Sequence, residues 1–194
     1  MEKNKLFDSF AEAISKTTTE LLKVNVFGEP ELKGHDIVEW YGKLKLFPWS
    51  KFHLPTYFCI MYYYAGEQDK ESHKPVGSII IYFERKESRD LLVPISSSRS
   101  INTQDIAGIE DHDEKEKKLN LKSVGEFSRK VSMYSLSGLQ GQGYEGLVLS
   151  EPHTLTAHES KDTIPFNSKT KKIYEMKFIL ERGQEIILDY IFPE

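Results

Sequence analysis

The sequence lacks the features that mark several large classes of protein. Cys59 is the only cysteine among the 194 residues, so no intramolecular disulfide can form, and the disulfide-rich modules of secreted proteins are excluded. The longest apolar runs, at residues 57–65 and 79–83, are far shorter than the roughly 20 residues that span a bilayer as a helix. No uninterrupted apolar segment resembles a secretory signal. We therefore expect a cytoplasmic protein that makes no membrane contact.

The sequence also lacks an excess of charge of one sign. It has 26 Lys and Arg against 30 Asp and Glu, and both signs are mixed along the chain. This balance argues against a dedicated nucleic-acid surface. The length favours one unit, so we expect residues 1–194 to form a single globular domain. Residues 96–118 are rich in serine and then in charge, and we expect a flexible charged loop there.

Apolar residues recur at helical spacing in two segments. Residues 3–22 carry an apolar stripe with charged residues between, which predicts an amphipathic helix. Ser123 and Glu126 have the spacing of a capping box, in which each side chain accepts a hydrogen bond from a free backbone N–H at a helix start. The sequence therefore predicts a second helix of about three turns from Ser123 to near Gly138.

Other segments indicate β-structure. Continuous apolar runs at 57–64 and 78–83 are typical of central strands that are covered on both faces. Residues 91–95 predict an edge strand, because Pro94 cannot donate a hydrogen bond to a ladder. Residues 28–48 are rich in glycine and proline and predict a loop.

The C-terminal segment predicts a β-hairpin that turns at residues 182–184. The expected pairs lie on one face of the hairpin: Leu180 with Ile186, Phe178 with Leu188, Met176 with Tyr190, and Tyr174 with Phe192. Together these elements predict an α+β fold, in which two amphipathic helices pack on a mainly antiparallel β-sheet.

A glycine-rich loop spans residues 138–146. Gly141, Gly143 and Gly146 match the G-x-G-x-x-G spacing of phosphate-binding loops, but a predicted helix precedes them and a β-like run follows, the reverse of the dinucleotide-binding order. The same stretch also resembles the coenzyme A loop of acetyltransferases, which implies coenzyme A bound at these glycines. Our main interpretation is a structural loop without a cofactor, and cofactor binding is the alternative.

Established patterns of catalytic and metal-binding residues are missing. The histidines and acids at 110–114 and 151–159 have no recognised ligand spacing, so we expect no metal site. Glu175 and Lys177 match the E-x-K of restriction-type nucleases, but alternation along a strand explains them more simply. Cys59 lies inside the most apolar run and no G-x-S-x-G motif occurs, so we expect no nucleophile.

Aromatic and basic residues are interleaved at residues 40–58. Exposed, such residues supply the anchors of protein interfaces or stack single-stranded bases. Buried, they close the core beside the central strands. Both interpretations stay open, and the residues that we assign to a partner-binding surface in this segment are Trp40, Tyr41, Trp49 and Phe52.

The predicted function rests mainly on the absence of recognised catalytic and metal-binding motifs. We favour a non-catalytic protein that recognises another protein, and the specific hypothesis is a stoichiometric inhibitor or toxin-neutralising immunity protein. Glu110, Asp111, Asp113 and Glu114 would then occupy a basic groove of the target by charge complementarity. The alternatives are an enzyme that binds coenzyme A at the glycine loop and a protein that binds single-stranded nucleic acid through residues 40–58.

Overall fold

The computed structural model describes residues 5–36, 56–97, 101–156 and 172–192. Its helical segments are α1 (Lys5–Thr17), the π-helical turn η1 (Thr18–Leu22), α3 (Glu67–Glu71), α4 (Arg85–Ser96) and α5 (His112–Gln140). Its strands are β1 (Glu31–Asp36), β2 (Thr56–Tyr64), β3 (Gly77–Glu84), β4 (Val148–Leu149), β5 (His153–Thr156), β6 (Lys172–Ile179) and β7 (Glu185–Ile191).

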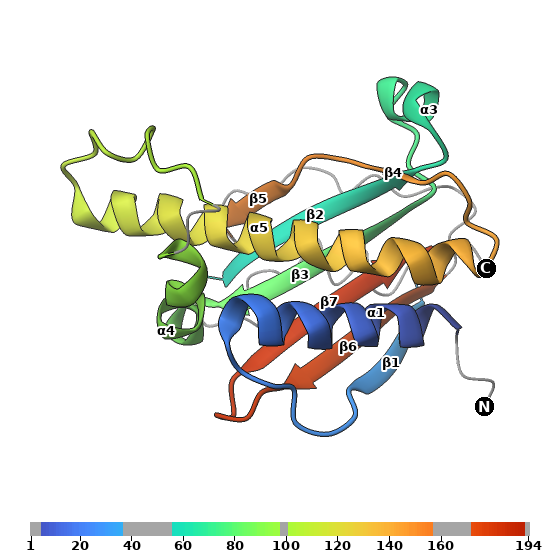
Figure 1. The fold of residues 1–194 in the computed structure, drawn as a ribbon, viewed down its shortest axis with the longest axis horizontal. Coiled ribbons are helices and arrows are strands. Elements are labelled where there is room, and N and C mark those ends of the chain that lie inside the picture. The colour runs from blue at the N-terminus through green and yellow to red at the C-terminus, as the bar shows by residue number, and fades with distance from the viewer. Residues whose placement is uncertain (1–4, 37–55, 98–100, 157–171, 193–194) are drawn as a thin grey trace.

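All seven strands belong to one antiparallel sheet. Its order is β1-β6-β7-β3-β2-β4, and β5 also pairs with β2. The two longest helices, α1 and α5, lie side by side across one face of this sheet (Figure 1). The predicted α+β class with a mainly antiparallel sheet is therefore confirmed.

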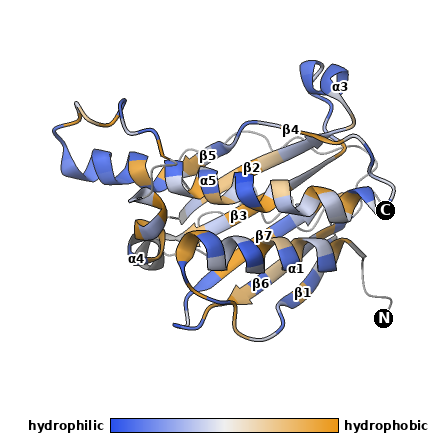
Figure 2. Cartoon of the chain, viewed as in Figure 1, coloured by the Kyte–Doolittle hydropathy of each residue, from blue (hydrophilic) through white to orange (hydrophobic). Residues whose placement is uncertain are grey.

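The predicted central strands, β2 and β3, are buried on both faces. Alternate residues of β2, such as Cys59 and Met61, face the helices, while Phe58 and Ile60 belong to a second apolar cluster on the opposite face. Apolar residues accordingly follow one another along these strands, whereas the first turns of α5 are hydrophilic (Figure 2). Burial raises the pKa of the Cys59 thiol to about 12.

The second predicted helix begins eleven residues earlier than the capping-box pattern indicates, at His112 rather than at Ser123. Asp111 is the N-cap, and its Oδ1 accepts hydrogen bonds from the backbone N–H groups of Asp113 at 2.8 Å and Glu114 at 3.1 Å. Ser123 lies inside the helix, where its hydroxyl donates to the carbonyl of Leu119. Residues 112–118 are thus helical, whereas the sequence predicted irregular structure for them.

The predicted edge strand at 91–95 is wrong, because this segment belongs to α4. Leu91, Leu92 and Ile95 are buried and lie on one face of that helix, and Pro94 lies within it.

The strand β1 lies inside the segment 28–48 that the sequence predicted to be a loop. Its residues are mostly charged or polar and carry little apolar alternation, so its pairing with β6 is not visible in the pattern.

The C-terminal hairpin is confirmed, but its predicted register is wrong by two residues. Tyr174 lies opposite Tyr190, Met176 opposite Leu188 and Phe178 opposite Ile186. The turn lies one residue earlier than expected, at residues 181–183, because Leu180 is opposite Gln184 and its N–H donates to the carbonyl of Gln184 at 2.8 Å. A shift of two residues preserves the side-chain alternation, so the same apolar face still points to the core.

None of the described helices is long and apolar enough to cross a membrane.

The start of β3 is in close contact with the C-terminal end of the described chain. A Cβ atom on Gly77 would lie 2.4 Å from Cε1 and 2.5 Å from Cδ1 of the buried Phe192 ring. We predict that Gly77→Ala lowers the free energy of unfolding by about 1–3 kcal/mol through overpacking. Urea denaturation measures this loss. Gly66→Ala is the matched control, because nothing lies within 4 Å of its added methyl group; equal losses in both variants would contradict the packing argument.

Candidate protein-binding surface

The aromatic residues assigned to partner binding, Trp40, Tyr41, Trp49 and Phe52, lie outside the described residues. The acidic residues assigned with them, at 110–114, lie at the start of α5. Asp111 caps the helix, and Glu114 forms an exposed ion pair with Lys118 at 3.2 Å. The described residues contain no group of three or more His, Cys, Asp or Glu that could hold a metal ion. The first turn of the helix explains the local geometry of these acids, and their role in partner binding stays a prediction.

The glycine loop connects α5 to β4. Gly141 is the C-cap residue of α5, and Gly143 and Gly146 have positive φ angles of 91° and 67°, which glycine adopts without strain. The segment that follows is β4 rather than a helix. A phosphate site of the dinucleotide or coenzyme A type places the anion at the N-terminus of a following helix. This loop therefore has the geometry of a helix-to-strand turn, and cofactor binding at it stays a prediction.

The middle of α5 borders a surface hollow of about 350 Å³. We call it the α5 hollow. One wall comes from α5, and the others come from the segment at 101–102 and from the start of β5, which are distant in sequence. The charged and polar residues that line it are Asn102, Lys122, Glu126, Arg129, Glu151 and Thr154.

Gly125 allows the β5 segment to approach α5 closely. A Cβ atom at this position would lie 3.1 Å from Cγ2 of Thr154 and 3.3 Å from Cβ of Pro152. Lys122, one turn earlier, donates from Nζ to the carbonyl of Asn102 and to Oδ1 of Asp105. These contacts hold the walls of the hollow together at one end.

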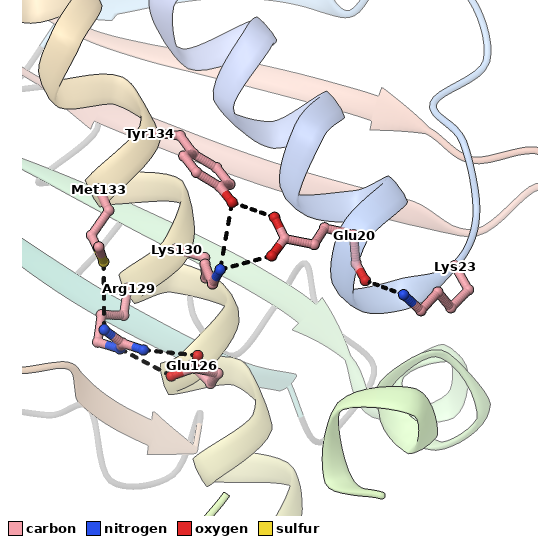
Figure 3. Close-up of polar contacts among 7 residues, drawn as sticks. All are labelled: Glu20, Lys23, Glu126, Arg129, Lys130, Met133 and Tyr134. Atoms are coloured by element: carbon pink, nitrogen blue, oxygen red, sulfur yellow. Dashed lines mark hydrogen bonds and ion pairs between the residues drawn. The ribbon is translucent and has the colours of Figure 1, made fainter. Parts of the chain in front are cut away.

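Three consecutive turns of α5 present a connected set of side chains beside the hollow (Figure 3). Arg129 donates from Nε and Nη2 to the two oxygens of Glu126, each at 2.9 Å, and from Nη1 to the sulfur of Met133 at 3.4 Å. The Glu126 side chain is only 12% exposed, whereas Arg129 is 43% exposed. Met133 is 46% exposed, and it is the exposed large apolar residue that α5 carries among the described residues.

A second group of side chains joins α5 to the end of α1 (Figure 3). Glu20, in η1, accepts hydrogen bonds from Lys130 Nζ at 2.8 Å and from the hydroxyl of Tyr134. Lys16 lies over the Tyr134 ring, 4.0 Å from its centroid. The hydrogen bonds from Lys130 and Tyr134 lower the pKa of Glu20, and the bond to Glu20 raises the pKa of Lys130.

Sequence reasoning did not single out the residues of the α5 hollow. Glu126 was assigned to a capping box, Glu151 was considered only within the group at 151–159 that lacks a metal-ligand spacing, and Lys122 and Arg129 were not considered. The spacing of Glu126 and Arg129 indicates an ion pair on one helix face. Nothing in the sequence indicates that residues 101–102 and 151–154 lie beside that face.

No family model matches the sequence, and no curated protein matches it. Several solved structures are similar in fold. A CheC-like superfamily protein from Shewanella sp. PV-4 superposes with a TM-score of 0.57, at 14% identity over 99% of each chain. A chain of the CheX–CheY–BeF3–Mg2+ complex from Borrelia burgdorferi gives 0.55, at 12% identity, over 96% of this chain and 97% of that chain. A chain of the FliM–SpeE complex from H. pylori gives 0.56, at 10% identity, over 100% of this chain and 90% of that chain. At these identities the likeness shows a shared fold.

The contact between α1 and α5 generates a pH prediction. Because the pKa of Glu20 is lowered in the folded protein, its contribution is present above the unfolded pKa and is lost as the pH falls through the folded pKa. We predict that Glu20→Gln destabilises the protein at pH 7 by at most about 1 kcal/mol, as for an exposed ion pair. The difference from the wild type should begin to shrink near the unfolded pKa of about 4 and disappear only below the lowered pKa of the folded state.

Thermal unfolding at a series of pH values measures this difference. Glu12→Gln, at an exposed position of α1, removes the same charge as the control. A constant offset between Glu20→Gln and the wild type across the whole pH range would contradict the assignment.

Proposed function

We propose that this chain is a non-catalytic protein-binding domain and that it recognises its partner through the α5 surface. We define this surface as the α5 hollow together with Met133. The observation that carries the proposal is the half-exposed Met133, which Arg129 and Glu126 hold beside the hollow.

The composition of this surface supports the proposal. Arginine and methionine are enriched in the cores of protein interfaces, and methionine adapts its shape to a partner. The ion pair between Arg129 and Glu126 already orders both side chains in the free protein, so binding orders them at a smaller entropic cost. The hollow offers the neighbouring space into which an anchor side chain of a partner can insert.

Two of the similar structures also support a binding role. They are complexes, one of CheX with CheY and one of FliM with SpeE. The shared fold is therefore found in proteins that have been solved together with a second protein. The partner proposed for this chain is likewise a protein.

The narrower hypotheses stay predictions. The comparisons lend no support to the roles of inhibitor and toxin-neutralising immunity protein. Cytoplasmic location, coenzyme A binding at Gly141, Gly143 and Gly146, and nucleic-acid binding through residues 40–58 are predictions from the sequence alone.

The proposal predicts that Met133→Glu weakens capture of the partner. Removing a contact at the centre of an interface costs more than about 1 kcal/mol, which corresponds to a loss of about fivefold or more in affinity. The immobilised chain is exposed to lysate of the organism that produces it, and captured proteins are compared between wild type and variant by quantitative mass spectrometry.

Phe27→Glu is the matched control. Phe27 is 71% exposed and lies in the connection between η1 and β1, next to Ile179 of β6 rather than on α5. A protein that the wild type and Phe27→Glu capture equally, and that Met133→Glu captures poorly, supports the proposal. Equal capture by Met133→Glu, or loss with Phe27→Glu alone, places recognition elsewhere and contradicts it.

A further inference from the structure

The cations of the α5 hollow are already neutralised by carboxylates. Lys122 contacts Asp105 and the carbonyl of Asn102. Arg129 binds both oxygens of Glu126. An incoming anion would have to displace one of these carboxylates, so the hollow is poorly suited to an acidic group of a partner.

Glu151 is the one carboxylate of the hollow that stays without a partner among the described residues. It is exposed, and it makes no hydrogen bond or ion pair with any described side chain. The residues that line the hollow include two cations, Lys122 and Arg129, and two carboxylates, Glu126 and Glu151. Arg129 pairs with Glu126, and Lys122 pairs with Asp105, which lies outside the lining. Glu151 is therefore the lining carboxylate that is left for an incoming cation.

The remaining walls suit a long side chain. Ile101, Leu121 and Pro152 line the hollow with apolar atoms beside the charged groups. Lysine and arginine pack their methylene stems along apolar surface while their charged ends bind acceptors. A carboxylate has room for about four hydrogen bonds, so Glu151 can accept a bidentate guanidinium.

We infer that the α5 hollow receives a basic side chain of the partner protein and that Glu151 is the carboxylate that recognises it. The inference rests on the proposed function and adds the chemistry of the partner to it. Pro152 and Ile101 contact the stem of the inserted side chain, and the Glu126–Arg129 pair forms the adjoining wall. Glu151 makes a charge-assisted hydrogen bond with the inserted ammonium or guanidinium group.

A small cationic probe tests this recognition without the partner. Nα-acetyl-arginine amide is titrated into the 15N-labelled full chain at low salt, and the neutral analogue Nα-acetyl-citrulline amide is titrated in parallel. We expect saturable shifts of amide signals at residues 121–129 and 151–154 with the arginine probe, and binding of the citrulline probe that is weaker by about threefold to fivefold. Equal binding of the two probes, or the absence of saturable shifts at these residues, overturns the inference.

Two variants assign the effect to the carboxylate. Glu151→Gln should weaken binding of the arginine probe by about the same factor and leave the citrulline probe unchanged. Glu145→Gln removes the same charge from an exposed residue of the glycine loop, outside the hollow, and should bind both probes as the wild type does. Unchanged arginine binding by Glu151→Gln, or an equal loss with Glu145→Gln, overturns the inference.

The proposed function and this inference fail separately. If Met133→Glu loses a captured partner while Glu151→Gln retains it with unchanged affinity, the protein-binding surface stands and the basic side chain is wrong. If Met133→Glu captures everything that the wild type captures, the proposed function fails, whatever the probes do.

Discussion

The arrangement of the molecule depends on the burial of β2 on both of its faces. This strand pairs with β3, β4 and β5, and it packs beneath α5. Its backbone groups are hydrogen-bonded in the ladders, and its side chains face two apolar layers, so displacing it would expose both. The hydroxyl of Tyr63 on this strand also lies 3.0 Å from Oγ of Ser135 on α5. The position of α5, and of the surface that it presents, therefore follows from β2.

The elements that sequence reasoning predicted well are those in which one pattern dominates. The short apolar runs of β2 and β3, rich in aromatic and β-branched residues, favour strands, and the long amphipathic stripe of α1 favours a helix. The errors arise where two local signals compete. At α5 a capping-box spacing at Ser123 concealed the stronger N-cap at Asp111, and in α4 a single Pro94 outweighed the helical spacing of three buried residues. The predicted hairpin register was wrong because side-chain alternation does not reveal the position of the turn, and moving the turn by one residue shifts the pairing by two and leaves the same residues on the apolar face.

The candidate site was less predictable than the fold, because it is built from segments that meet only in space. Lys122, Glu126 and Arg129 belong to α5, whereas Asn102 precedes this helix in the sequence and Glu151 follows it. Gly125 favours this close approach, since a Cβ atom there would lie 3.1 Å from Cγ2 of Thr154 and 3.3 Å from Cβ of Pro152, tighter than ordinary contact distances. A motif search finds residues at fixed spacing along the chain. It does not find a surface that forms where segments distant in sequence meet beside a glycine such as Gly125.

The burial of Cys59 makes the reactivity of its thiol a measure of whether β2 stays packed against α5. This thiol is fully buried on β2, and its raised pKa keeps it protonated at neutral pH, so alkylating reagents meet neither an accessible nor an ionised sulfur. Labelling therefore requires β2 to separate from α5. Since Cys59 is the only cysteine in the chain, the rate of thiol modification reports how often β2 opens away from α5.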